Sequence, residues 1–164
     1  MAYHEIVKSD PLKLIISIAG CFLAAVLGSV VTTPNISVWY AFLVKPPLNP
    51  PNWIFGPVWT LLYFLMAVAA WLVWRKGLAD PNVRDALSIF IVQLVLNVLW
   101  SFSFFGVRMP IFGFLVIIGL WVAILATVLR FFKIDRTAGW LMVPYLLWVS
   151  FASYLNLGVA LLNR

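Results

Sequence analysis

The sequence predicts an all-α integral membrane protein: a bundle of five transmembrane helices with a Pro/Trp-rich lid loop between the first helix and the second. The chain is 65% hydrophobic and only 10% charged over 164 residues, whereas a soluble domain is about half apolar and about a quarter charged. Its apolar residues form five runs, and a run of about 20 such residues crosses a bilayer as a helix. Because backbone polar groups must be satisfied internally in lipid, runs joined by mostly short loops indicate a compact antiparallel bundle.

The charge balance and the single cysteine exclude several other classes of protein. Eleven Lys+Arg against five Asp+Glu give a formal net charge of +6. In so apolar a chain this excess reflects membrane topology and contact with anionic lipid headgroups, so no nucleic-acid partner is expected. Cys21 is the only cysteine, which excludes a disulfide framework and a cysteine-rich metal site. Since it lies within an apolar run, we interpret it as a small buried hydrophobic residue.

The first helix is predicted at about residues 12–31, after a short polar tail at residues 1–11. A cleaved signal peptide is the alternative, because lysines precede the apolar run. The run is longer than a signal core and no A-x-A site follows it, which favours a retained helix. Small residues recur along it every four positions, at Gly20, Ala24 and Gly28. This spacing allows close helix packing, either within the bundle or between two protomers.

Residues 32–54 are predicted to form a stiff apolar lid. Four prolines lie within six residues, at Pro46, Pro47, Pro50 and Pro51. Proline excludes an interior helix and favours extended backbone, which lowers the entropy cost of holding one shape. The lid also carries Trp39 and Trp53, so it packs onto something rather than serving as a polar linker. Its single charge, Lys45, either reaches the lipid headgroups or pairs with a ligand bound below.

The other four helices are predicted at about residues 55–74, 87–105, 111–132 and 139–162. Short connections join them, so the lid is the one long connection in the chain. The tryptophans near their ends are typical of the aromatic belt at a membrane interface; these are Trp71, Trp74 and Trp140.

Basic residues set the expected orientation. Eight lie on the side of the N-terminus: Lys8, Lys13, Arg75, Lys76, Arg84, Arg130, Lys133 and Arg136. Three lie on the opposite side: Lys45, Arg108 and Arg164. The positive-inside rule therefore predicts the N-terminus inside and the lid outside. Which membrane the protein occupies stays open.

No Asp, Glu, Lys, Arg or His lies deep within a predicted span. Ion-coupled pumps and small exporters usually need a carboxylate in the membrane, and a serine hydrolase needs a base beside its nucleophile. The only histidine, His4, belongs to the tail, and no metal-ligand cluster is present in the sequence. The sequence therefore predicts neither a metal site nor a conventional acid–base active site.

Two predicted helices carry neutral polar and aromatic residues on one face. In the third these are Gln93, Asn97, Trp100, Ser101 and Phe104. In the fifth they are Tyr145, Trp148, Ala152 and Asn156. Amides at such positions can simply link neighbouring helices, at about 1 kcal/mol each. Two such faces beneath an aromatic lid favour the other interpretation, the walls of a pocket.

Three segments together resemble the TspO/MBR family, which contains tryptophan-rich sensory proteins and the mitochondrial translocator protein. They are WYAFLVKPPLNPPNWIFGPVWTLLY, QLVLNVLWSFSFFG and AGWLMVPYLLWVSFASYLN. The resemblance runs through nearly the whole chain after the tail, so residues 1–164 are expected to form a single domain of this family. It implies a five-helix bundle, commonly a homodimer, whose first loop closes over a ligand cavity. It also implies porphyrins such as protoporphyrin IX or haem, sterols, and synthetic isoquinolines or benzodiazepines as ligands, with no separate cofactor.

The resemblance also assigns roles to residues. Trp53 and Trp148 match tryptophans that line the cavity and take part in porphyrin binding and its light-dependent breakdown, and Asn97 and Trp100 match other lining positions. The full set expected to bind ligand is Trp53, Gln93, Asn97, Trp100, Ser101, Tyr145, Trp148 and Ala152. The lid is expected to consist of Trp39, Lys45, Pro46, Pro47, Pro50 and Pro51.

The chain departs from the family pattern at two places. The sterol-recognition pattern of animal members needs a basic residue soon after a tyrosine, but Tyr154 is followed by Arg164 only ten residues later. Cholesterol is therefore not expected as the native ligand. Leu48 stands where many members carry an aromatic residue, which alters how the lid meets a ligand.

Three functions follow from the resemblance. The first is a receptor or translocator for tetrapyrroles, in which apolar burial and aromatic contact bind the macrocycle. The second is an enzyme that degrades bound porphyrin in light, with Trp53 and Trp148 as electron partners and the excited porphyrin supplying the reactivity. The third is a ligand-gated sensor that acts through protein partners without transport.

Overall fold

The computed structural model describes residues 2–164, with side chains described from residue 10 onward. Within these residues the chain forms five long helices: α1 (Ala2–Val38), α2 (Phe55–Trp74), α3 (Pro81–Ser101), α4 (Pro110–Ile134) and α5 (Arg136–Leu162). Each of the five contains a segment long and apolar enough to cross a membrane. The predicted all-α membrane fold is therefore confirmed.

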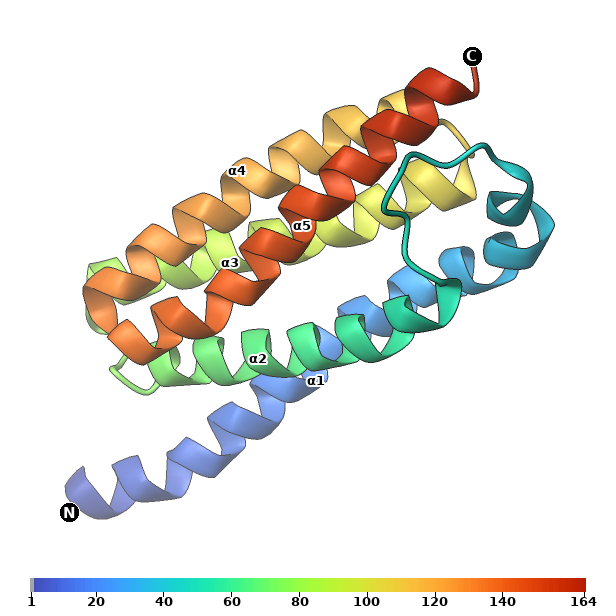
Figure 1. Ribbon diagram of the computed structural model, residues 1–164. Coiled ribbons are helices and arrows are strands. Elements are labelled where there is room, and N and C mark those ends of the chain that lie inside the picture. The colour runs from blue at the N-terminus through green and yellow to red at the C-terminus, as the bar shows by residue number, and fades with distance from the viewer. Residues whose placement is uncertain (1) are drawn as a thin grey trace.

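The helices run antiparallel in one bundle (Figure 1). α4 and α5 share the most extensive interface, α5 also packs on α2, and α1 packs on α2 and α3. The lid connection, the α3–α4 connection and the C-terminus lie at one end of the bundle in Figure 1. The N-terminus, the α2–α3 turn and the α4–α5 turn lie at the other end. The connections with many basic residues and those with few are thus at opposite ends of the bundle, as the positive-inside rule requires.

Helix α1 is longer than predicted at both ends. It begins at Ala2, within the segment expected to be a tail, and it continues to Val38 through Pro34. Pro34 lacks one N–H and so breaks one helical hydrogen bond. Beyond it Asn35 stabilises the last turns, because its Nδ2 donates to the Val31 carbonyl over 2.7 Å and its Oδ1 accepts from Arg108 Nε over 3.0 Å. The lid is accordingly shorter than the predicted 32–54 and starts after Val38.

Helices α3 and α5 also begin before their apolar runs. Asp80 caps α3 by accepting a hydrogen bond from the Asn82 N–H over 2.8 Å, and Pro81 follows at the first helical position. Asp135 caps α5 in the same way by accepting from the Ala138 N–H over 3.0 Å. The predicted starts at residues 87 and 139 followed hydropathy alone, which does not detect a polar first turn.

Three ion pairs tie the helices together at the N-terminal end of the bundle. They are Asp10–Arg75 at 3.1 Å, Asp135–Lys76 at 3.3 Å and Asp85–Arg130 at 2.6 Å. Exposed pairs contribute about 0–1 kcal/mol each, so they fix connections more than they stabilise the fold. Partial burial acts to raise the pKa of Asp135. The hydrogen bonds from the Ala138 N–H and from Lys76 outweigh that effect and hold this pKa below its ordinary value.

The small-residue stripe of α1 serves packing within the bundle at two of its three positions. Ala24 and Gly28 are buried, and a Cβ added to Gly28 would lie 3.1 Å from Ser101 Oγ of α3. Gly20 is exposed, and a Cβ there would meet no atom within 4 Å. Cys21 is buried in the core, as its apolar surroundings predicted.

Candidate functional site

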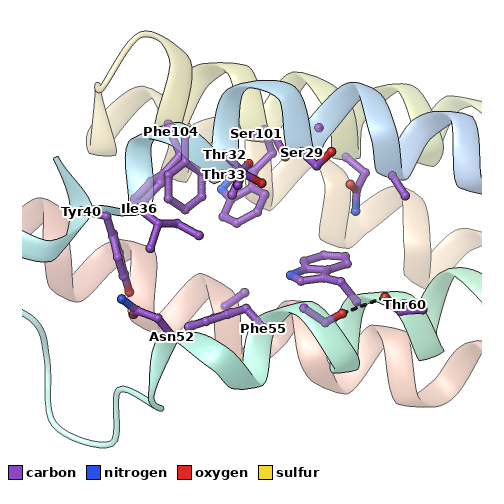
Figure 2. A pocket seen from close by; sticks show the side chains of 18 of the residues that line it. Ser29, Thr32, Thr33, Ile36, Tyr40, Asn52, Phe55, Thr60, Ser101 and Phe104 are labelled. Atoms are coloured by element: carbon purple, nitrogen blue, oxygen red, sulfur yellow. Dashed lines mark hydrogen bonds between the residues drawn. The ribbon is translucent and has the colours of Figure 1, made fainter. Parts of the chain in front are cut away.

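A cavity of about 490 Å³ lies between α1, α2, α3 and α5, beneath the lid. This volume falls within the range of about 300–1,000 Å³ that is typical of small-molecule sites. Figure 2 shows side chains of α1 and α3 on one wall and Asn52, Phe55 and Thr60 on the wall opposite. No Asp, Glu, Lys, Arg or His occurs among the described residues that line it. The cavity is therefore neutral, and its surface is mostly apolar and aromatic.

A hydrogen-bonded group closes the floor of the cavity. The Tyr63 hydroxyl donates to Asn97 Oδ1 over 2.7 Å, and Asn97 Nδ2 donates to the Tyr145 hydroxyl over 2.8 Å. All three side chains are buried. Asn97 thus provides a hydrogen-bond partner for two phenols on different helices and has both of its own polar atoms bonded. This stabilises the fold, because a buried polar group without a partner costs about 1–3 kcal/mol.

Two tryptophans form an aromatic wall above this floor. The rings of Trp59 and Trp100 contact each other, with centroids 6.3 Å apart and planes inclined by 31°. Trp100 is fixed in place because its Nε1 donates to Asn156 Oδ1 over 3.0 Å, and Asn156 Nδ2 in turn donates to the Pro110 carbonyl over 2.7 Å. A wall of held rings binds a flat apolar body without first having to order its own side chains.

The lid is fastened to α5. The Val44 N–H donates to Asn163 Oδ1 over 2.9 Å, and Asn163 Nδ2 donates back to the Val44 carbonyl over 2.9 Å. The Tyr154 hydroxyl donates to the Pro47 carbonyl over 2.8 Å. Pro46 is buried against Gly158, where an added Cβ would lie only 2.5 Å from the proline ring. Glycine at this position is what lets the lid lie directly on the helix.

The start of the lid packs on the end of α3. Its last turn is a π-helical segment, Phe102–Gly106; the rings of Phe104 and Phe105 contact Trp39 and Tyr40 at centroid distances of 5.5–6.3 Å. Burial raises the pKa of Tyr40 to about 12, although its hydrogen bond with Asn49 acts in the opposite direction.

Lys45 does not face the cavity. Its Nζ donates to the carbonyls of Ala41 and Leu43 over 3.2 Å each and lies 4.9 Å from the centroid of the Tyr40 ring. These contacts occupy the ammonium group within the lid itself. Of the two roles predicted for Lys45, pairing with a ligand in this cavity is the one its position does not favour.

The cavity opens along the seam between α1 and α2. All lining residues from α3 and α5 are buried except Trp100, which is half-buried. The exposed lining residues come only from α1 and from the chain between Asn52 and Thr60; they are Val26, Ser29, Thr33, Asn52, Trp53, Gly56 and Thr60. Trp53 is 73% exposed and forms part of this mouth.

The structure brings five of the predicted binding residues to the cavity and keeps three outside its lining. Trp53, Asn97, Trp100, Ser101 and Ala152 line it. Tyr145 lies behind Asn97, to which it is hydrogen bonded. Gln93 lies one turn deeper, fully buried, with its Nε2 3.8 Å from Met66 Sδ. Helical spacing predicted the shared face correctly but not how far down α3 the cavity extends.

Trp148 does not line the cavity, although the resemblance implied that it does. Its ring contacts Phe55 at a centroid distance of 6.0 Å, and it borders a shallow groove with Val58 and Phe151. Phe55 thus stands between Trp148 and the cavity, because Phe55 itself lines the cavity wall. Among the predicted lid residues, Trp39, Lys45 and the four prolines cover the site without lining it.

The sequence interpretation missed the contribution of α1 and of Trp59. The face of α1 that lines the cavity includes Ser29, Thr32, Thr33 and Ile36. These positions follow i, i+3, i+4, i+7 spacing, the signal for one helix face. It went unused because residues from 32 onward were assigned to the loop.

The fold and the site define a multi-pass membrane protein with an aromatic, uncharged ligand cavity under a lid. The sequence matches the TspO/MBR family over residues 17–162. Tryptophan-rich protein TspO of Chlorobaculum tepidum is 43% identical over 152 residues, which cover 93% of this chain and 96% of that protein. Tryptophan-rich protein TspO of Archaeoglobus fulgidus is 41% identical over 153 residues, covering 93% and 97%. Human Translocator protein is 36% identical over 120 residues, covering 72% and 70%.

The chain belongs to the TspO/MBR family. The resemblance drawn from the tryptophan and proline motifs is thereby confirmed. Membership in a family of sensory and translocator proteins supports a membrane receptor or sensory role for this chain.

Proposed function

We propose that the protein is a membrane receptor that binds flat, apolar ligands in the lidded cavity, with tetrapyrroles such as protoporphyrin IX as the foremost class. The observation that carries this proposal is the aromatic wall formed by Trp59 and Trp100, whose ring planes are inclined by only 31°. A macrocycle in the cavity can lie against this wall. Haem, sterols and synthetic isoquinolines share the required flatness and apolarity.

The energetics favour burial of a large ring system. Apolar surface contributes about 25 cal/mol per Å² removed from water, so burying about 300 Å² supplies about 7 kcal/mol. Part of this offsets the cost of association, and the held walls reduce that cost. The neutral lining favours burial of the apolar macrocycle. It offers no charged group to pair with the two propionates of protoporphyrin IX, which would have to stay in water at the mouth of the cavity.

The names of the relatives support two consequences of binding. The relatives named translocator protein favour movement of the ligand across the membrane, and the relative named tryptophan-rich sensory protein favours regulation. Ligand flux into proteoliposomes, with and without protein, separates these outcomes: flux supports transport, whereas saturable binding without flux supports sensing.

We also propose the orientation and the homodimer. The concentration of basic residues at the N-terminal end supports an inside N-terminus and an outside lid. Exposed apolar side chains along α1 and α3 supply lipid-facing surface on which a second copy can pack. Accessibility of single engineered cysteines from each side of a sealed vesicle tests the orientation, and crosslinking in the bilayer tests the dimer.

Light-dependent degradation of bound porphyrin is the second candidate function. It needs electron donors beside the ligand rather than acids and bases. Three tryptophans that line the cavity are such donors: Trp59 and Trp100 in its wall and Trp53 at its mouth. Trp148 is separated from the ligand by Phe55, so we assign it at most an indirect role.

One titration tests both candidates. Purified protein is titrated with protoporphyrin IX while tryptophan quenching is followed in the dark and porphyrin absorbance is followed under light. Saturable quenching without bleaching supports the receptor, and protein-dependent bleaching supports the enzyme. If quenching does not saturate, both proposals fail. Trp140→Phe, which removes an exposed tryptophan outside the cavity lining, should leave the binding curve unchanged.

A further inference from the structure

Most hydroxyl groups on the helices bond to the backbone of their own helix. Seven do so, each to a carbonyl three or four residues earlier: Ser29, Thr60, Ser88, Ser103, Thr127, Ser150 and Ser153. Such a bond occupies the hydroxyl proton, which is the usual arrangement for serine and threonine in a helix. These groups have no proton left to donate to a ligand.

Three hydroxyls that line the cavity are different. Thr32, Thr33 and Ser101 make no hydrogen bond with any residue that the structure describes. Among the residues whose side chains are described, the other helix hydroxyls of serine and threonine without such a bond are Ser17, Ser37 and Thr137, and none of these lines the cavity. Free hydroxyl donors and the cavity therefore coincide, and they do so on one wall.

Gly28 brings Ser101 close to the face of α1 that carries Thr32. Thr32 is four residues after Gly28 on α1, so the two share a helix face. The absence of a side chain at Gly28 lets Ser101 of α3 approach, since a Cβ there would lie 3.1 Å from Ser101 Oγ. Figure 2 shows Thr32, Thr33 and Ser101 gathered on the wall that faces Phe55 and Thr60.

The charge around these hydroxyls limits what they can bind. They donate from neutral groups, and none of the described lining residues is charged. Lys45 is the one charged residue of the lid, and its ammonium group donates hydrogen bonds to backbone carbonyls of the lid. A carboxylate taken into this wall would be buried without a counter-charge, which is costly. A neutral acceptor, such as an ester, ketone or amide carbonyl, loses much less on leaving water.

We propose that Thr32, Thr33 and Ser101 form a polar subsite that binds the neutral carbonyl oxygen of a flat apolar ligand. This rests on the proposed function and adds the orientation of the ligand. The edge of the ring that carries carbonyl substituents lies against α1, and the bare ring lies against the wall formed by Trp59 and Trp100. The subsite selects for neutral acceptors and against free carboxylates.

The test compares dissociation constants in the dark for two probes, protoporphyrin IX dimethyl ester and octaethylporphyrin. The two have macrocycles of the same shape, but only the first carries carbonyl groups. Thr32→Val, Thr33→Val and Ser101→Ala remove the hydroxyls with little change of shape. Ser153→Ala is the control, because Ser153 lies outside the cavity lining and its hydroxyl is bonded to the Val149 carbonyl.

We expect at least one of the three variants to weaken binding of the dimethyl ester by about three- to tenfold, the value of one hydrogen bond. Octaethylporphyrin should bind all variants within about twofold of the wild type, and Ser153→Ala should change the affinity for neither probe. The dimethyl ester should bind the wild type at least as tightly as free protoporphyrin IX at neutral pH.

Each contrary result has a distinct meaning. Unchanged affinity of the ester in all three variants overturns the subsite but leaves the proposed function standing. Equal losses for both porphyrins also overturn it, because they would show a contact of shape rather than a hydrogen bond. Much tighter binding of the diacid than of the ester overturns the selection for neutral acceptors. If neither porphyrin binds the wild type saturably, the proposed function fails and the subsite fails with it.

Discussion

Replacing Gly158 with alanine should lift the lid from α5. An added Cβ would lie 2.5 Å from Cβ and 2.6 Å from Cγ of Pro46, whereas ordinary van der Waals contact begins at 3.4 Å. The proline ring cannot rotate away, so the lid or the helix must move by about 1 Å. Such overpacking costs about 1–3 kcal/mol, and the better helix propensity of alanine returns up to about 1 kcal/mol.

The expected net cost is about 1–2 kcal/mol, which corresponds to a factor of about 5–30 in the population of the seated lid. We expect the affinity for protoporphyrin IX in the dark to fall by a similar factor in Gly158→Ala. Gly20→Ala is the matched control, because a Cβ at Gly20 meets no atom within 4 Å; it should keep full affinity. Equal affinities for the two variants would refute the account of how the lid is held.

Three further predictions concern the lid clamp, the cavity floor and the charged end. Asn163→Ala removes both bonds to Val44, so hydrogen exchange at the Val44 amide should rise about tenfold; unchanged exchange would disprove the clamp. Asn97→Leu leaves two phenols without their partner and should lower the free energy of unfolding by about 2–4 kcal/mol. Adding Tyr145→Phe to it should cost less than the sum of the two single changes, and strict additivity would contradict the network. Because the pKa of Asp135 is lowered in the folded protein, its contribution is present above the unfolded pKa near 3.8 and is lost as pH falls through the folded pKa. The thermal midpoint of the wild type should therefore fall more steeply below about pH 4 than that of Asp135→Asn, and parallel pH profiles would count against it.

The five spans were predictable because hydropathy alone determines where a helix can cross lipid. The helix ends were not, since they depend on single polar side chains. Asp80 and Asp135 are visible capping signals in the sequence, but their effect on helix start can be judged only together with the turn before them. The predicted end of α1 at residue 31 followed the apolar run, whereas hydrogen bonds of Asn35 with Val31 and Arg108 stabilise the turns beyond it.

The candidate site was predicted in part for a similar reason. Helical spacing placed Asn97, Trp100 and Ser101 on one face correctly. Helical spacing does not reveal which neighbouring helix each face contacts. It therefore did not distinguish Trp148, which packs on Phe55, from the residues that line the cavity. The hydroxyls of Thr32 and Thr33 were missed because their importance lies in an unmade hydrogen bond, which no sequence pattern records.

The central claim is that a flat ligand occupies the cavity between the wall formed by Trp59 and Trp100 and the lid. Ala152 is buried and lines this space, so Ala152→Phe places a ring where the ligand would lie. The most direct measurement is the dark titration with protoporphyrin IX of the wild type and this variant, with thermal unfolding measured on both. We predict saturable quenching for the wild type and at least tenfold weaker binding for a variant that still unfolds cooperatively. Equal affinity in a folded Ala152→Phe variant would contradict the claim.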